Sequence, residues 1–271
     1  MNPKALSGWP AIVQQARHHT QVRRDLWCHE QLRVGSVAEI HLPALAAWPQ
    51  WVQVRPDRVA LSPRGEDLTH ALGVINAQLR QQGLIAAWRD ELFSLWDPSS
   101  DQALAALERA SARFWGTLTL GAHCNGYVAD AQGQPSQIWV AQRALTKPTD
   151  PGKLDNLIGG GVPQGQSPRE TVIREGWEEA GLRPQDMLAL QSAGILELDR
   201  DVQEGRQWER LHVFDLALSQ DFTPCNQDGE VARLQCVPIS QAVEWALSGE
   251  MTVDAAWVTL DFAFRWGAWA P

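Results

Sequence analysis

Three carboxylates gather within five residues in the middle of the chain. Glu175, Glu178 and Glu179 lie at positions i, i+3 and i+4, so on a helix they would share one face. Like charges at this spacing destabilise a helix by roughly 0.2–0.5 kcal/mol per pair. Mg²⁺ would offset this repulsion, because it takes oxygen ligands, keeps several waters and bridges carboxylates to phosphate groups. The alternative is an acidic helix face that contacts only water.

The residues around these glutamates predict the helix that carries them. Residues 167–170, Ser-Pro-Arg-Glu, form a capping box with proline at the first helical position. Gly181 is suited to end the helix in the left-handed conformation. We therefore expect a helix over residues 168–180. Three apolar residues at helical spacing are expected to face a core: Ile173, Trp177 and Ala180.

Short helices and strands are expected to alternate in the first part of the chain. Residues 66–83 predict an amphipathic helix that ends at a glycine. A second helix is expected over residues 101–116, where alanines and leucines form an apolar stripe before another glycine. Residues 88–96, between the two, favour a strand.

After residue 116 the pattern changes towards strands. Residues 126–130 and 137–143 predict a β-hairpin across a turn rich in glycine, proline and glutamine. Further strands are expected over residues 187–200 and 210–218, and a helix over residues 239–249. Mixed strands with helices between and after them predict an α+β domain.

The length and composition limit the architecture and the class of function. A chain of 271 residues favours two domains, and we expect them over residues 1–115 and 116–271, the first a smaller α/β accessory domain. A net charge of −9 argues against a nucleic-acid partner. An acidic enzyme that acts on an anionic substrate needs a cation between its own carboxylates and that substrate.

The sequence also predicts a compartment and a redox state. Neither a long apolar run nor an amino-terminal secretory pattern is present, so we expect a cytoplasmic protein without a membrane partner. The four cysteines are scattered and form no C-x-x-C pair, which favours reduced thiols over a zinc site or a disulfide framework.

The spacing of the glutamates matches a known signature, G-x5-E-x7-R-E-U-x-E-E-x-G-U, where U is apolar. Starting at Gly160, the chain supplies R-E at 174–175, E-E at 178–179 and G-L at 181–182. Two positions depart from the signature: Gln166 replaces the first glutamate, and Gly176 an apolar residue. The sequence therefore closely resembles the Nudix hydrolases. This resemblance implies a mixed β-sheet sandwiched between helices over residues 116–271.

The resemblance also implies roles for the residues of the signature. Glu175, Glu178 and Glu179 would coordinate Mg²⁺, with Mn²⁺ as an alternative. Arg174 would orient a glutamate by ion pairing. Gly160 and Gly161 would belong to the substrate-binding loop before the helix. Gln166 would remove one formal charge from the metal site while keeping an acceptor oxygen.

Four further blocks resemble one branch of this family: residues 108–128, 142–161, 222–231 and 249–267. They are similar to Nudix proteins related to the domain fused to thiamine pyrophosphokinase in some fungi, in which a smaller domain precedes the Nudix fold. The implied activity is hydrolysis of thiamine diphosphate, or of its oxidised and damaged analogues, to the monophosphate and phosphate.

Residues outside the signature are candidates for the remaining chemistry. By similarity, Glu230 is a candidate base or further ligand, and Glu178 and Glu179 are competing choices for the base. The other candidates would bind substrate: Arg143 and Lys147 its diphosphate, and His123 and Asn125 its ring. Each also has an ordinary structural explanation, as a solvated surface charge or a hydrogen-bonded strand residue.

Two other functions stay open at this stage. The protein could hydrolyse a nucleoside diphosphate derivative instead. It could also be a non-catalytic Nudix ligand-binding protein, for which Gln166 is the motivation. Isomerase chemistry on this fold ranks lower. The substrate is in each case a small-molecule diphosphate, and a homodimer is compatible with the sequence.

Overall fold

The computed structural model describes residues 9–271, without the side chain of Ile12. The accessory domain expected over residues 1–115, and the amino-terminal pattern used to predict the compartment, therefore begin outside the described residues. Within residues 9–271, none of the helices combines the length and hydropathy that a membrane span requires.

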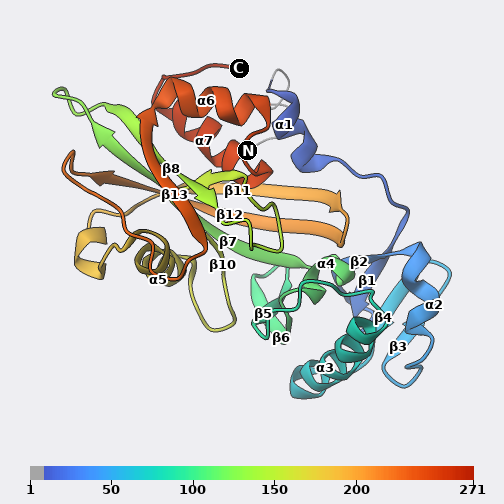
Figure 1. Ribbon diagram of the computed structural model, residues 1–271. Coiled ribbons are helices and arrows are strands. Elements are labelled where there is room, and N and C mark those ends of the chain that lie inside the picture. The colour runs from blue at the N-terminus through green and yellow to red at the C-terminus, as the bar shows by residue number, and fades with distance from the viewer. Residues whose placement is uncertain (1–8) are drawn as a thin grey trace.

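A seven-stranded mixed sheet forms the centre of residues 116–271, here called the main unit (Figure 1). Its strands run in the order β11 (Gln191–Val202), β12 (Gly205–Leu218), β7 (Leu118–Ala129), β8 (Pro135–Arg143) and β13 (Val231–Pro238). Strands β7 and β12 are parallel, and the other pairs are antiparallel. The predicted hairpin is confirmed as β7 and β8, and the later strands as β11 and β12.

The sheet separates two hydrophobic cores, because alternate residues of each strand point to opposite faces. In β12, Leu211 and Val213 pack under helices α6 (Ile239–Ser248) and α7 (Val253–Arg265). Phe214 and Leu216 point the other way and belong to the core beneath helix α5 (Pro168–Ala180). The chain is therefore an α+β protein whose mixed sheet lies between helices, as expected.

Two short strands complete the sheet where β7 and β8 diverge. Strand β10 (Ile158–Gly161) pairs with residues 121–124 of β7, and β9 (Leu154–Asn156) pairs with residues 140–142 of β8. The hairpin contact between β7 and β8 begins only at Tyr127. The diverging strands thus leave room for the loop that leads into α5.

Residues 23–115 form a second unit, here called the accessory unit (Figure 1). Its four-stranded sheet has the order β2 (Leu32–Ala38), β1 (Arg23–Cys28), β4 (Arg58–Leu61) and β3 (Val52–Val54). The helix predicted over residues 66–83 is confirmed as α3 (Gly65–Gln81), and its apolar stripe is buried: Leu68, Leu72, Ile75 and Leu79. The short helix α2 (Leu42–Leu45) joins the same core.

The helix predicted over residues 101–116 is wrong. Residues of β6 (Gln102–Glu108) pair with β5 (Leu92–Asp97), and only the short helix α4 (Ser111–Trp115) follows. Alanine and leucine favour helices intrinsically, but the pairing with β5 decides the conformation of residues 102–108. The strand expected over residues 88–96 is β5, and Gly116 ends α4 in the left-handed conformation, with φ +56°.

The segment before the accessory unit packs on the main unit. Helix α1 (Ala11–Gln14) lies beside α6 and α7 in Figure 1, and the chain then crosses to β1. Trp9 is 4% exposed, with its ring centroid 5.2 Å from that of Trp269. Val13 and Ala16 join the same core. Residues at both ends of the described chain thus share one core.

Candidate active site

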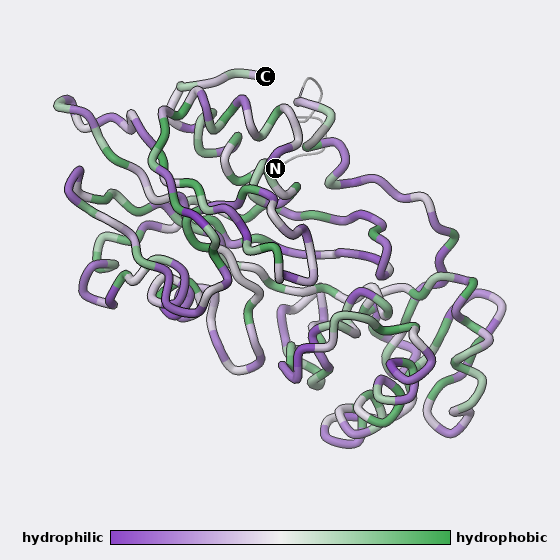
Figure 2. The backbone as a smooth tube through the Cα atoms, in the orientation of Figure 1, coloured by the Kyte–Doolittle hydropathy of each residue, from purple (hydrophilic) through white to green (hydrophobic). Residues whose placement is uncertain are grey.

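Helix α5 begins and ends where its sequence predicts. The Ser167 hydroxyl accepts from the backbone N–H of Glu170 at 3.2 Å, and the Glu170 carboxylate accepts from the backbone N–H of Ser167 at 2.8 Å. Gly181 ends the helix with φ +69°. Figure 2 shows α5 as mainly hydrophilic, so its position against the sheet depends on a narrow apolar face.

That apolar face differs from the predicted one. Ala180 is buried and Ile173 packs against the core, but Trp177 is 48% exposed, so the prediction for Trp177 is wrong. Gly176 faces inward instead, and a Cβ there would lie 2.8 Å from Sδ of Met187. The Met187 side chain therefore fills the space that an apolar residue at position 176 would take.

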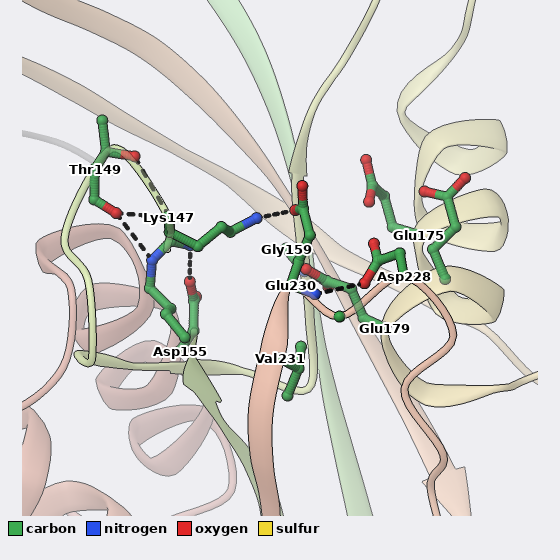
Figure 3. Close-up of polar contacts among 12 residues, drawn as sticks. Lys147, Thr149, Asp155, Gly159, Glu175, Glu179, Asp228, Glu230 and Val231 are labelled. Atoms are coloured by element: carbon green, nitrogen blue, oxygen red, sulfur yellow. Dashed lines mark hydrogen bonds and ion pairs between the residues drawn. The ribbon is translucent and has the colours of Figure 1, made fainter. Parts of the chain in front are cut away.

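The three glutamates of α5 occupy different surroundings. Glu179 is 6% exposed and accepts from the backbone N–H of Gly159 at 2.9 Å (Figure 3). Glu175 lies against Gly160, where any side chain would overlap its carboxylate. Glu178 is more exposed. Gly160 thus lets the Glu175 carboxylate approach the backbone closely, while Glu179 is held by the backbone N–H of Gly159.

Arg174 joins two of these glutamates. Its Nη1 lies 2.7 Å from Oε2 of Glu178, and its Nη2 lies 2.8 Å from Oε1 of Glu175. The amide oxygen of Gln166 accepts from Nε of Arg174 at 3.4 Å and from the hydroxyl of Thr171 at 3.2 Å. Gln166 therefore contacts the arginine of the signature and does not reach the buried glutamates through a hydrogen bond.

Burial changes the acidity of the two inner glutamates. Desolvation raises the pKa of Glu175 to about 7, although Arg174 opposes the shift. Desolvation and the charge of Glu175 raise the pKa of Glu179 well above its ordinary value. Two neighbouring buried carboxylates are thus unfavourable as a pair of anions without a nearby cation.

The donor set fits Mg²⁺ by its chemistry, since it offers the carboxylate oxygens of three neighbouring glutamates. Among residues 9–271, however, no three His, Cys, Asp or Glu side chains are already grouped as a metal site. Arg174 accounts for part of this, because it draws Glu178 and Glu175 towards itself. A metal would have to compete with that arginine for at least one carboxylate.

A cleft with about 850 Å³ of empty space adjoins the glycines of β10. Residues of the main unit that line it include His123, Arg143, Thr149, Asp155 and Gly159 to Gly161. The accessory unit contributes Phe93, Arg109 and Arg113. The cleft therefore lies between the two units, beside the glutamates of α5.

Arg143 and Lys147 each pair with a carboxylate, and of the two only Arg143 lines the cleft. Nη1 of Arg143 lies 2.8 Å from Oδ2 of Asp155, and Nη2 donates to the carbonyl of Thr149 at 2.9 Å. Lys147 forms an ion pair with Glu230. Partial burial would raise the pKa of Glu230, but Lys147, with Arg109, holds it below its ordinary value. Glu230 is therefore a carboxylate anion and a weakened base.

His123 and Asn125 lie on β7 but face different partners. Nδ1 of His123 is 2.9 Å from Oδ1 of Asn156, and the histidine lines the cleft. Asn125 is fully buried and donates to Asp215 at 3.0 Å. The structure thus places His123 at the cleft and Asn125 in a buried polar network outside its lining.

Sequence reasoning missed the residues of the accessory unit at the cleft. Phe93 and Arg109 carry no local motif, and they reach the site only because β5 docks on the loop before α5. The backbone N–H of Gln164 donates to the carbonyl of Leu92 at 2.8 Å. A Cβ at Gly161 would lie 2.5 Å from Cζ of Phe93. Glycine is thus required at 161 for the two units to approach.

Comparison with known proteins assigns both parts of the chain. Residues 121–260 match the NUDIX domain family. The chain belongs to the Nudix family. Residues 11–119 match the domain of unknown function DUF4743, so a Nudix fold is preceded by a second recognised region.

Relatives of this Nudix protein are known in plants. Nudix hydrolase 24, chloroplastic, of Arabidopsis thaliana is 34% identical over 215 residues, covering 76% of this chain and 56% of that protein. Nudix hydrolase 20, chloroplastic, of the same plant is 33% identical over 228 residues, covering 78% and 58%. The chain thus spans somewhat more than half the length of these curated relatives.

A solved structure shares the Nudix fold. DR0079 of Deinococcus radiodurans superposes with a TM-score of 0.50 at 18% identity, and the match covers 64% of this chain and 99% of that one.

Proposed function

We propose that the protein is a Mg²⁺-dependent hydrolase that cleaves the diphosphate linkage of a small organic diphosphate. The observation that carries the proposal is the pair of carboxylates of buried Glu179 and half-buried Glu175, held against the glycines of β10 beside a cleft lined with arginines. The carboxylates would hold a metal cation on one side of the substrate's phosphates, and the arginines would supply positive charge on the other side.

Glu175, Glu178 and Glu179 of α5 would hold the metal. Glu175 and Glu179 lie against β10, and Glu178 is more exposed. When bound, Mg²⁺ would neutralise charge on the diphosphate and lower the pKa of a coordinated water. Arg174 positions two of the glutamates through its ion pairs. The Gly159 N–H fixes the Glu179 carboxylate. Mn²⁺ is the alternative ion.

A general base must be held in position for the proton that it takes and be basic enough to accept it. Glu179 has a raised pKa and a fixed orientation, which favours it. Glu230 has a lowered pKa and is paired with Lys147, which makes it a weaker base. We therefore place Glu179 ahead of Glu178 and Glu230.

The substrate we favour is thiamine diphosphate, or an oxidised or damaged analogue of it. The support is the resemblance of four sequence blocks to the branch related to the fungal thiamine pyrophosphokinase fusion. Three of these blocks, residues 108–128, 142–161 and 249–267, contribute to the cleft. His123 lies there as a polar group for a heteroaromatic ring. The cytoplasmic location, a homodimer and the division at residue 115 stay predictions.

A substrate panel tests the proposal. Thiamine diphosphate, its oxo and oxy analogues, nucleoside triphosphates, ADP-ribose and dinucleoside polyphosphates would be incubated with the protein, with Mg²⁺ or with EDTA. We expect metal-dependent release of phosphate from the thiamine compounds. Preference for nucleotides would move the assignment to a nucleotide-derivative hydrolase. Tight binding of a diphosphate without turnover would instead indicate the non-catalytic ligand-binding protein.

Replacing Glu179 with glutamine tests the site itself. We expect Glu179→Gln to lower kcat by about two orders of magnitude or more, because it removes a metal ligand and the favoured base. The amide keeps an acceptor for the Gly159 N–H, and it removes a buried charge, so the thermal midpoint should not fall. The matched control is Glu244→Gln on the exposed side of α6. Wild-type turnover in Glu179→Gln would refute the assignment.

A further inference from the structure

The imidazole of His123 lies beside the backbone that holds the glutamates of α5. Among residues 9–271, His123 is the only histidine that lines the cleft, and it lies opposite Gly159 in the pairing of β7 with β10. A Cβ at Gly159 would lie 3.0 Å from Cε1 of His123 and 3.1 Å from Nδ1, so the glycine leaves room for the ring. The backbone N–H of Gly159 also holds the Glu179 carboxylate. One glycine therefore separates the imidazole from Glu179.

A buried chain of hydrogen bonds begins at Nδ1 of this imidazole. Nδ1 is 2.9 Å from Oδ1 of Asn156. The other end of that amide, Nδ2, lies 3.3 Å from Oδ1 of Asn125 and 3.2 Å from the hydroxyl of Thr259. Nδ2 of Asn125 donates to Oδ1 of Asp215 at 3.0 Å. The chain of hydrogen bonds ends at Arg265, whose guanidinium pairs with both oxygens of Asp215.

These hydrogen bonds decide which nitrogen of His123 carries the proton. Asp215 accepts, because its carboxylate is paired with a guanidinium, so Asn125 must turn its NH₂ group towards Asp215 and its oxygen towards Asn156. Asn156 must then offer its own NH₂ group to Asn125, and its oxygen faces the imidazole. Nδ1 of His123 is therefore the donor. In the neutral ring, Nε2 is left as an acceptor.

This second nitrogen, Nε2, is open to a ligand. Although His123 is only 6% exposed, its Nε2 has no hydrogen-bond partner within 3.5 Å in the described part of the chain. It is not sealed in the interior, in contrast to Nδ1 of His29, which is buried without a partner. An acceptor held in a largely buried side chain is unfavourable unless a ligand or a water donates to it.

The charged groups of the cleft cannot take the place of Nε2. Five arginines line the cleft, and they only donate, which suits phosphate oxygens: Arg109, Arg113, Arg143, Arg200 and Arg206. Four carboxylates accept, but their charge repels a diphosphate: Asp150, Asp155, Glu209 and Asp254. Threonine hydroxyls also line the cleft, but they rotate and either donate or accept. Nε2 differs from all of these as a neutral acceptor whose direction is fixed.

We infer that Nε2 of His123 accepts a hydrogen bond from an N–H group on the organic part of the substrate. Asn156 and Asn125 are positioning residues that hold the required tautomer. The inference rests on the proposed function, which makes the cleft the substrate site. It narrows the substrate to diphosphates whose ring carries an amino group or a ring N–H, such as the aminopyrimidine of thiamine. A ring without an N–H would leave Nε2 without a partner and would bind more weakly.

Long-range ¹H–¹⁵N NMR reads the tautomer without any ligand. The protein would be labelled with ¹⁵N-histidine and held with EDTA at about pH 8, where an ordinary imidazole is neutral. We expect the proton of His123 on Nδ1. Asn156→Ala should increase the form with the proton on Nε2, because it removes the acceptor for Nδ1. His70, exposed on α3, is the internal reference and should keep its spectrum. A wild-type ring with its proton on Nε2 overturns the inference.

Calorimetry with EDTA tests the hydrogen bond to the ligand. The wild type would be compared with His123→Asn, whose amide can still donate to Asn156 but has no nitrogen in place of Nε2. The probes are thiamine diphosphate and its analogue with hydrogen in place of the amino group. We expect the wild type to bind the amino compound about tenfold more tightly, and His123→Asn to bind both about equally. His70→Asn, the same change at an exposed position, is the matched control and should keep the wild-type preference.

A second pair of probes covers the nucleotide alternative. ADP and purine riboside diphosphate also differ by one amino group, and they replace the thiamine compounds if the protein binds nucleotides instead. Asn156→Ala should lose part of the preference for the amino compound in either pair, because it changes the tautomer of His123. Failure of both pairs to bind overturns this inference.

The outcomes separate this inference from the proposed function. An equal preference for the amino compound in the wild type and His123→Asn, or no preference in the wild type, overturns the role of His123 even if Glu179-dependent hydrolysis is present. A preference that depends on His123, in a protein that cleaves no diphosphate with Mg²⁺, supports the inference and removes the enzymatic proposal.

Discussion

Gln166 shows how one amide changes the electrostatics of the signature. A glutamate at this position would give Arg174 a third carboxylate, whereas the amide oxygen supplies a neutral acceptor at 3.4 Å. Arg174 therefore pairs fully with Glu175 and Glu178. The departure from the signature leaves the glutamates of α5 in place. With no third carboxylate to pair with, the Arg174 guanidinium interacts more strongly with Glu175 and Glu178.

The raised pKa of Glu175 predicts how the metal-free protein responds to pH. Its pKa is about 7 in the folded protein and 4.5 ordinarily, so between these values the folded state binds more protons than the unfolded state. The free energy of unfolding should therefore fall as pH rises from about 4.5 to about 7, by on the order of 3 kcal/mol from this group, and then level off.

Urea denaturation in EDTA between about pH 5 and pH 8 measures this effect. The fall in the free energy of unfolding with rising pH should be smaller in Glu175→Gln, because glutamine cannot ionise. It should be unchanged in Glu244→Gln. Saturating Mg²⁺ should reduce the fall in the wild type, because the cation stabilises the ionised carboxylate. Parallel pH profiles for the wild type and Glu175→Gln would contradict the assignment of Glu175 as the titrating group.

At the scale of elements, the capping box fixes where α5 begins and so where its glutamates lie. Ser167→Ala removes the hydroxyl that accepts from the Glu170 N–H. We expect a loss of about 1 kcal/mol in the free energy of unfolding, measured by urea denaturation. Ser167→Thr keeps the acceptor and should lose less. Equal stability of Ser167→Ala and the wild type would mean that packing alone holds this end of the helix.

The same helix shows how far the sequence could predict the fold and the site. Its ends follow from local chemistry, a cap and a left-handed glycine, and both are confirmed. Its buried face depends on how segments outside the helix pack against it, so the exposure of Trp177 and the contact of Gly176 with Met187 could not be predicted from spacing.

The prediction of a helix that includes residues 102–108 is wrong for a related reason. Their alanines and leucines suit a helix, but β5 offers them a partner strand, and pairing across a hairpin outweighs a weak intrinsic preference. The cleft has the same dependence on tertiary contacts. Phe93 and Arg109 reach it from a separate unit, so neither could be recognised by its position relative to the signature.

At the scale of the whole molecule, a tryptophan near the start of the chain supports the main unit. Trp9 is 4% exposed, and it packs against Phe264 and Trp269. We expect Trp9→Ala to lower the free energy of unfolding by about 3–5 kcal/mol, as for a large buried aromatic residue. Trp177→Ala, at an exposed position, is the control and should change it by about 0.5 kcal/mol or less.

Denaturation followed by tryptophan fluorescence and by hydrogen exchange in α7 would test this prediction. Loss of protection in α7 of Trp9→Ala, with α3 unchanged, is the expected pattern, because Trp9 shares a core with α7 and not with α3. A variant as stable as the wild type would show that the contact with α7 contributes little.

The crossing of the chain from α1 to the accessory unit also sets an order of events at the ribosome. Trp9, Val13 and Ala16 are synthesised before α7, the helix that shares their core. The accessory unit can complete its own core while that first segment is still without its partner. The protein therefore gains its final layer only when α7 has left the ribosome, and until then an apolar segment beside α1 is available to chaperones.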